Sequence, residues 1–475
     1  MMRSFVLALF VLFTTSAHAQ DTVKLSGKIT NPSCDSIVFR YNDNFIAYYP
    51  KDFVAHVDSK GKFSLAFPVP HGIYTQANIL YGDKAAEIIL QPADSLTLTV
   101  DAKRFDSSIH YSGKGSAIQN MLARHSIEKG SINQYTLKIK THINKEPDDF
   151  IKSIEIERKL ENDFLDKYKA GIPKSFIKYW TAYFQYYNYF FIQQYPLTHA
   201  MLKVRGYTDT VPEANFSVVK QMPYAFNDSL LQLPPYLLYL TGVIDIKLKA
   251  AGYRFYPKDT AHQREFQDSV TKLVYKLMPP KSAEYYMAQN LYGRARNQPL
   301  DKTEAMFADF KKHWPASGYL PLLQKQVAIV ESLAPGQPAP DFDIITPDGK
   351  KMRLSDLKGK VVYLGFWASW CKQCVGEMIK ENKIKDLIKN KPLEFVYVSI
   401  DDDAAKDTTL TSKYKITGTF HHAIGGWNAK EIMLYGVQSL PAYYLIDEDG
   451  NFALQNAPGP LQTTELILAI EKLLK

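Results

Sequence analysis

The sequence predicts three successive regions: a β-sandwich-like N-terminal domain, a mainly α-helical middle region and a C-terminal α/β domain. Polar and apolar residues alternate in 22–29 and 94–100, as they do in half-buried strands. Apolar residues recur at helical spacing in 151–169. In 341–475, strand-like apolar runs alternate with helical patterns, which is typical of a parallel sheet. A chain of 475 residues is also long enough for about three domains.

The composition is that of a globular protein and argues against nucleic-acid binding. Hydrophobic residues make up 46% of the chain and charged residues 22%, which excludes a disordered or collagen-like class. The formal charge of +8 is carried by separated lysines, and no arginine-rich tract or nucleic-acid-binding motif accompanies it. We therefore expect no nucleic-acid partner.

Residues 1–19 resemble a cleavable secretory signal peptide. Arg3 supplies the positive start, 5–13 an apolar stretch that is too short for an ordinary membrane-spanning helix, and Ala17-His18-Ala19 a cleavage site. An uncleaved N-terminal anchor is the alternative. Either way, we expect the protein in the periplasm or cell envelope, where disulfides can persist.

The β-rich region spans 20–112 and contains one of the three cysteines. The stretch 58–63 reads as a turn that leads into a strand. Cys34 follows Asn31-Pro32-Ser33 in a predicted loop. This odd cysteine is either a reactive or intermolecular thiol or, as we favour, an unpaired residue without a role.

The helical region spans 116–330. Helical patterns recur in 229–251, 265–277 and 302–312, but no fixed repeat period links them, so a regular solenoid is not supported. The stretch 176–191 is dense in aromatic residues. Such residues either form a platform that grips a partner chain or, more often, fill the core, which is the interpretation we favour.

A segment dense in proline and glycine, 331–340, predicts a linker before the α/β domain at 341–475. The expected elements in that domain alternate between strand and helix. They are a hairpin of 342–346 and 351–354, strand 361–366, helix 372–389, strand 395–400, helices 404–414 and 428–435, strands 443–446 and 452–455, and a last helix from about 462.

Two cysteines three residues apart, Cys371 and Cys374, lie where strand 361–366 passes into the next helix. Free backbone N–H groups and the helix dipole favour a thiolate at a helix N-terminus, and Lys372 acts in the same direction. We therefore expect Cys371 to be the exposed nucleophile. Cys374, one turn further along, is placed to attack the mixed disulfide that Cys371 forms.

Two other interpretations of the Cys-x-x-Cys motif are possible. A structural zinc site needs four ligands, but Cys34 is the one other cysteine, and His421 and His422 lack the usual spacing. A purely structural disulfide would close so small a loop that it would stabilise the fold little. We favour a redox pair that needs no metal and no bound cofactor.

Residues 335–475 resemble the TlpA/ResA-like branch of the thioredoxin superfamily, a group often described together with AhpC/TSA proteins. The motifs are Pro338-Ala339-Pro340-Asp341-Phe342, Phe366-Trp367-Ala368-Ser369-Trp370-Cys371-Lys372-Gln373-Cys374 and Gly436-Val437-Gln438-Ser439-Leu440-Pro441. The resemblance implies a thioredoxin-like fold for the C-terminal domain and a cis-proline at Pro441.

The same resemblance implies further site residues. Glu377 corresponds to a buried acid that relays a proton during resolution, and it is the only acid near the thiols in sequence. Trp370, Leu440 and Lys372 are the expected substrate-docking residues, with the backbone of Leu440 pairing with an extended substrate.

We therefore expect an exported thiol-disulfide oxidoreductase that reduces disulfides of envelope proteins and is recharged by a membrane thiol donor. One alternative is an envelope protein-binding module with incidental thiols. Another is a thiol peroxidase, which we favour less because Ser369 and Trp370 occupy the positions where a peroxidatic cysteine needs a Thr-x-x-Cys setting.

Overall fold

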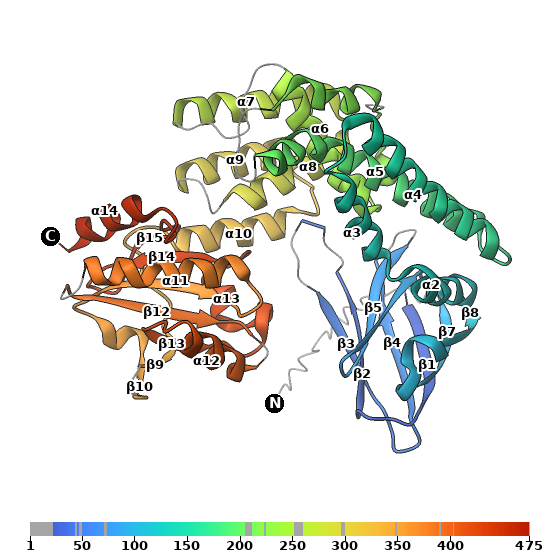
Figure 1. Ribbon diagram of the computed structural model, residues 1–475, viewed down its shortest axis with the longest axis horizontal. Helices are drawn as coiled ribbons and strands as arrows, with labels where there is room; N and C mark the ends of the chain where they lie inside the picture. Colours follow the sequence, from blue (N-terminus) through green and yellow to red (C-terminus); the bar gives the residue numbers. More distant parts are fainter. Residues whose placement is uncertain are drawn as a thin grey trace, which may run out of the picture. The chain divides into compact units, whose positions relative to one another are not determined.

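The computed structural model describes residues 22–42, 45–46, 50–70, 74–204, 211–222, 225–250, 260–295, 300–346, 349–388, 391–401 and 403–474. The chain divides into two compact units, Met1–Tyr286 and Met287–Lys475 (Figure 1). The predicted signal peptide and two residues of the predicted hairpin turn, Pro347 and Asp348, lie outside the described residues. Within the described ranges, no helix is long and apolar enough to cross a bilayer.

The described residues at the start of the first unit form eight strands in two four-stranded sheets, drawn in blue in Figure 1. The sheet orders are β4-β1-β7-β8 and β3-β2-β5-β6, and β1 pairs in parallel with β7. The strands are β1 (Thr22–Thr30), β2 (Ser36–Tyr41), β3 (Lys51–His56), β4 (Lys62–Pro68), β5 (Thr75–Tyr81), β6 (Lys84–Leu90), β7 (Ser95–Asp101) and β8 (His110–Lys114). The strand-rich N-terminal region predicted from the alternating pattern is therefore confirmed.

The alternating residues of β1 and β7 supply the core between the two sheets. Val23, Leu25 and Ile29 are buried, while Lys24 and Lys28 are exposed. A Cβ at position 27 would lie 2.3 Å from the carbonyl oxygen of Leu98 on β7, and Gly27 avoids this clash. Close pairing of these two strands therefore depends on glycine.

Cys34 lies in the predicted loop between β1 and β2 and is a free, half-buried thiol. Its backbone N–H donates a hydrogen bond to the hydroxyl of Tyr81 at 2.9 Å, and its carbonyl accepts one from the same hydroxyl at 3.1 Å. The backbone of Cys34, rather than its sulfur, is thus tied to the sheet.

The rest of the first unit is helical, as predicted. Its elements are α1 (Phe105–Ser108), α2 (Ser116–Lys129), α3 (Ile132–His142), α4 (Pro147–Tyr168), α5 (Lys174–Lys203), a 3₁₀ segment (Glu213–Gln221), α6 (Pro234–Ala250) and α7 (Thr260–Leu277). Helix α8 (Pro280–Arg294) spans the division between the units, and α9 (Leu300–His313) and α10 (Leu320–Ser332) follow it.

The aromatic stretch 176–191 forms the first half of α5, and each of its aromatic side chains is buried or half-buried. Trp180 is 1% exposed, packs edge-on against His125 and Phe184, and donates from its indole nitrogen to the carbonyl oxygen of Glu161 at 3.2 Å. These rings therefore form core, the interpretation favoured above, and not an open platform.

In the part of the C-terminal domain that the structure describes, a seven-stranded sheet has the order β10-β9-β13-β12-β11-β14-β15. Its elements are β9 (Asp343–Ile345), β10 (Lys351–Arg353), β11 (Val361–Trp367), α11 (Lys372–Leu387), β12 (Leu393–Ser399), α12 (Ala404–Lys413), β13 (Thr419–His422), α13 (Lys430–Leu434), β14 (Ala442–Ile446), β15 (Phe452–Leu454) and α14 (Thr463–Leu473). Strands β11, β12 and β13 are parallel, and β14 is antiparallel to β11. This is the predicted thioredoxin-like α/β fold.

The predicted linker at 331–340 is joined to this domain by backbone contacts. Leu333 is fully buried in the core of the domain. The N–H of Gly336 donates to the carbonyl of Phe452 at 2.8 Å, and Pro338 forms an isolated bridge with Asn451. The segment continues from α10 onto the edge of the sheet, whereas the division between the compact units falls earlier, after Tyr286.

Candidate active site

Strand β11 delivers Cys371 to the N-terminus of α11. All seven residues of the strand are buried, because it lies in the interior of the sheet between β12 and β14. Cys371 is the N-cap residue of α11, and its Sγ accepts a hydrogen bond from the backbone N–H of Cys374 at 3.2 Å. The predicted position at a strand-to-helix junction is thus confirmed, with a helix N–H directed at the sulfur.

The two cysteines form a disulfide with a sequence separation of three. Cys371 is 9% exposed and Cys374 is 0% exposed. Of this pair, therefore, only Cys371 presents surface that an incoming sulfur could reach. Among the described residues, no group of three or more His, Cys, Asp or Glu side chains could hold a metal ion.

The expected docking residues around the cysteines differ in exposure. Trp370 is 57% exposed, and its ring centroid lies 6.3 Å from that of Trp427. Lys372 is exposed. Trp367, in contrast, is buried at the end of β11, so it belongs to the core of the domain and not to the exposed surface around the cysteines.

Pro441 lies at the same end of the sheet as the cysteines. The Leu440–Pro441 peptide bond is cis, as the resemblance implied. Ala442 starts β14 and pairs with Phe366 near the end of β11, which places Pro441 opposite the segment that leads to Cys371. Leu440 and Pro441 are both half-buried.

Glu377 is 4% exposed and lies one turn beyond Cys374 on α11. Its Oε1 accepts from Nε2 of Gln373 at 2.9 Å, and its Oε2 accepts from the hydroxyl of Tyr443 at 3.1 Å. Gly459 allows this approach, since a Cβ there would lie 2.6 Å from Glu377 Oε2. The acid expected beneath the thiols is therefore buried, with one donor on each carboxylate oxygen.

A second buried acid on the same helix, Glu381, was not singled out from the sequence. Glu381 is fully buried, one turn beyond Glu377. Its Oε1 accepts from the hydroxyl of Tyr397 at 2.9 Å. Burial raises the pKa of Glu381, an effect that the charge of Lys385 opposes. The spacing Cys374, Glu377, Glu381 follows one helix face, which is the sequence signal that could have revealed it.

A hydrogen-bonded network that sequence reasoning also missed anchors the loop before Cys371. The backbone N–H and hydroxyl of Ser369 donate to the two carboxylate oxygens of Asp401 at 2.6 and 2.7 Å. Ser399 lies between Asp401 and Asp407, and Asp407 contacts His422 at 2.8 Å. Burial raises the pKa of Asp407 to about 6. This network fixes the residue two positions before the nucleophile.

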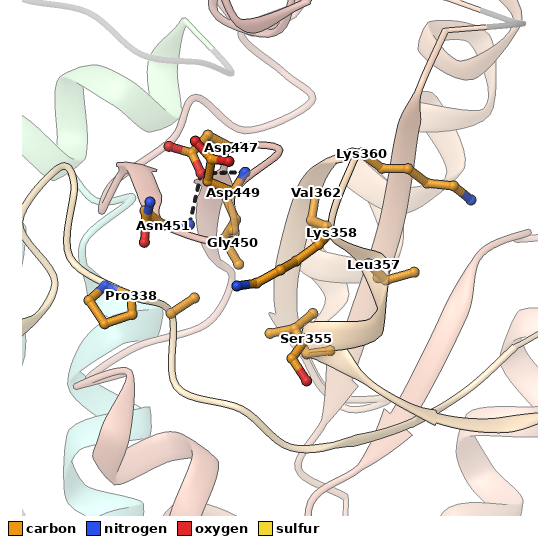
Figure 2. Close-up of a pocket in the computed structure, with 13 residues that line it drawn as sticks. Pro338, Ser355, Leu357, Lys358, Lys360, Val362, Asp447, Asp449, Gly450 and Asn451 are labelled. Carbon is orange, nitrogen blue, oxygen red and sulfur yellow. Dashed lines mark hydrogen bonds between the residues drawn. The ribbon is translucent and has the colours of Figure 1, made fainter.

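A separate pocket lies at the other end of β11 (Figure 2). Lys358, Lys360, Asp447 and Asp449 are among its lining residues, and β11 begins at Val361. Its volume of about 210 Å³ is below the roughly 300–1,000 Å³ of typical small-molecule sites. Because the pocket lies at the end of β11 opposite the cysteines, we do not assign it to the redox site.

The comparisons with known proteins concern this C-terminal domain. The family described as Redoxin matches residues 334–461. The thiol-disulfide oxidoreductase ResA of Bacillus thuringiensis is 37% identical over 134 residues, which cover 28% of this chain and 76% of that protein. The thioredoxin-like protein YneN of Bacillus subtilis is 35% identical over 129 residues, which cover 27% of this chain and 71% of that protein.

Among solved structures, the thioredoxin domain of a thiol-disulfide oxidoreductase from Bacteroides vulgatus is similar. It is 24% identical, with a TM-score of 0.27, and the match covers 30% of this chain and all of that one. The extent and identity of the sequence match to ResA show the family. Through its C-terminal domain, the chain belongs to the ResA-type thiol-disulfide oxidoreductases of the thioredoxin superfamily.

Proposed function

We propose that this protein is an exported oxidoreductase that reduces disulfides in other envelope proteins through the Cys371/Cys374 dithiol. The observation that carries this proposal is the unequal exposure of the two sulfurs at the N-terminus of α11. A two-step exchange needs one accessible nucleophile and one protected thiol directly behind it. Cys371 and Cys374 have this relationship.

The exchange begins with the reduced dithiol. The thiolate of Cys371 attacks one sulfur of the substrate disulfide, the substrate S–S bond breaks, and one substrate sulfur leaves as a thiolate. The Cys374 thiolate then attacks Cys371 Sγ. The Cys371–Cys374 disulfide forms and the second substrate thiolate leaves, so that two electrons have passed to the substrate.

The helix N-terminus favours the first step. The N–H of Cys374 donates to Cys371 Sγ, and the positive end of the α11 dipole stabilises negative charge on that sulfur. Glu377, buried beside Cys374, is the proposed proton acceptor when Cys374 becomes the attacking thiolate. Trp370 and Lys372, the sequence neighbours of Cys371, and the backbone of Leu440, at the same end of the sheet, are the proposed docking groups for an extended substrate segment.

The disulfide that this reaction leaves must be reduced again. We propose that a membrane thiol donor supplies the two electrons. The signal-like pattern at 1–19 supports export, and disulfides that need such a reductant persist outside the cytoplasm. Dithiol exchange itself needs no bound cofactor.

Trapping of the covalent intermediate tests the proposed roles. With Cys374→Ser, attack by Cys371 cannot be followed by resolution, so we expect a mixed disulfide with an envelope protein that accumulates and disappears on treatment with a small thiol. Non-reducing electrophoresis followed by mass spectrometry measures it.

Cys371→Ser is the matched control, because it removes the exposed sulfur and leaves the buried one. We expect this variant to form no such adduct and to lose reductase activity toward a model disulfide. Wild-type activity in Cys371→Ser would refute the assignment of the nucleophile.

A further inference from the structure

Helix α11 carries a buried acid that the two-cysteine exchange does not require. Glu381 is 0% exposed and lies four residues after Glu377 and seven after Cys374. Residues at this spacing lie on one face of a helix. Cys374, Glu377 and Glu381 therefore form a line that leads from the buried sulfur into the domain.

The carboxyl group of Glu381 is only half satisfied. Its Oε1 accepts from the Tyr397 hydroxyl, but no hydrogen-bond donor within the described residues reaches Oε2. A fully buried carboxylate oxygen without a donor is costly, whereas a protonated carboxyl group avoids burying the charge. This geometry favours a proton on Glu381.

Lys385 interacts with Glu381 through Tyr397. Its Nζ donates to the Tyr397 hydroxyl at 2.5 Å and to the carbonyl oxygen of Thr417. It also lies 4.6 Å from the centre of the Phe395 ring. The described contacts thus give a chain from Lys385 to the Tyr397 hydroxyl and then to Glu381.

The other groups that face Glu381 come from three strands and from α11 itself. Tyr397 of β12, Tyr363 of β11 and Tyr443 of β14 stay neutral, because burial raises the pKa of each. Glu377 faces Glu381 from the preceding turn. Among the charged groups, Lys385 opposes the protonation of Glu381, and Glu394 acts on Lys385.

Glu377 and Glu381 are buried carboxyl groups one turn apart whose oxygens are satisfied to different degrees. Both oxygens of Glu377 accept a hydrogen bond, whereas Oε2 of Glu381 has no donor among the described residues. Burial raises the pKa of Glu381, and the negative charge of Glu377 acts in the same direction. Of the two groups, Glu381 is the one whose surroundings favour the neutral form.

We propose that Glu381 is a positioning residue that stays protonated and so leaves Glu377 as the single carboxylate behind Cys374, where it accepts the Cys374 proton. The inference rests on the resolving role of Cys374 in the proposed function. The Cys374 S–H bond breaks and the proton passes to the Glu377 carboxylate. The resulting thiolate forms the S–S bond to Cys371, the bond from Cys371 to the substrate sulfur breaks, and that sulfur leaves with the electron pair.

Single-turnover reaction of the reduced full-length protein with bis-thionitrobenzoate disulfide separates the two steps. Attack by Cys371 releases the first thionitrobenzoate, and attack by Cys374 releases the second. Stopped-flow absorbance gives both rates as a function of pH. Cys374→Ser is the control that must lack the second phase.

We expect the second phase of the wild type to show an inflection toward slower rates in the range where Glu381 ionises, because a charged Glu381 adds a second negative charge behind Cys374 and disfavours its thiolate. Glu381→Gln keeps an acceptor for Tyr397 but cannot ionise. Its second phase should lack this inflection, agree with the wild type within about two-fold at lower pH and diverge several-fold above it. Its first phase should be unchanged.

Tyr397→Phe is a second test, which should move the inflection instead of removing it, in a protein that keeps Glu381. Loss of the hydroxyl donor removes a group that stabilises the charged carboxylate, so the inflection should move to higher pH. An unchanged inflection in Glu381→Gln, or equal slowing of both phases at every pH, would overturn the proposal. Failure of the proposed function would look different: the wild type itself would lack a Cys374-dependent second phase.

Discussion

Cys371 and Cys374 are chemically identical residues that the fold makes unequal. Both lie at the N-terminus of α11, but Cys371 retains 9% exposure and Cys374 none. The sulfur of Cys371 caps the helix by accepting a hydrogen bond from the Cys374 N–H. Residue-level placement, rather than residue type, thus separates the proposed nucleophile from the proposed resolving thiol.

At Glu377, replacement by Gln tests proton transfer at the scale of one residue. We expect the Cys374-dependent second phase to slow by about 100-fold, because general base catalysis contributes on that order, while the Cys371-dependent first phase stays within about two-fold. Stopped-flow release of thionitrobenzoate measures both. Asp386→Asn, which removes an exposed acid from the same helix, is the control. A second-phase rate in Glu377→Gln equal to that of the wild type would exclude Glu377 as the base.

At the scale of elements, α11 combines a catalytic N-terminus with a buried acidic face. Periodicity predicted the helix and its start, because those depend on residues close in sequence. It did not predict that Glu381 is buried, because a glutamate at an inward-facing position departs from the usual pattern. The hydrogen bonds from Ser369 to Asp401 could not be predicted from local patterns either, since they join residues 32 positions apart.

The buried face of α11 predicts a pH-dependent stability. The pKa of Glu381 is raised on folding, chiefly by burial, so its contribution to stability is greatest below its ordinary pKa of 4.5 and decreases as the pH rises through the raised value. Near pH 8 we expect the free energy of unfolding of Glu381→Gln to exceed that of the wild type by about 1–3 kcal/mol, because the wild type then buries a poorly compensated carboxylate. Near pH 4 the difference should vanish or reverse.

Urea unfolding of the oxidised proteins at the two pH values measures this difference. A wild-type free energy of unfolding that changes with pH no more steeply than that of Glu381→Gln would contradict the assignment of a raised pKa.

At the scale of the whole molecule, the sequence predicted the order of the regions better than their junction. Alternation in the strands and helical spacing in the middle region are local patterns, and both regions were confirmed. Proline and glycine in 331–340 indicated a linker, but burial of Leu333 and the pairing of Gly336 with Phe452 depend on strands more than a hundred residues later. Composition alone contains no information on such contacts.

The aromatic helix α5 gives a whole-molecule prediction. Trp180→Ala should destabilise the first unit by about 3–5 kcal/mol, as expected for truncation of a fully buried large side chain. Reduction of a model disulfide below the unfolding temperature should stay at the wild-type rate, because the thiols and their described contacts lie in the second unit. Leu202→Ala, at an exposed position of the same helix, should change stability by no more than about 0.5 kcal/mol.

Calorimetry and a turnover assay on the same samples check this prediction. A Trp180→Ala protein of wild-type stability that no longer captures its partners would instead favour the aromatic helix as a binding surface.

The reduction potential of the Cys371/Cys374 couple tests the central claim, that this protein is a disulfide reductant, most directly. Equilibration of the mature chain with defined thiol buffers, followed by quantification of free thiols, gives the value. We predict a potential near or below about −250 mV, on the thioredoxin side of the known range. A potential near about −120 mV, like that of a strong oxidant, would contradict the account and make reduced exported proteins the substrates.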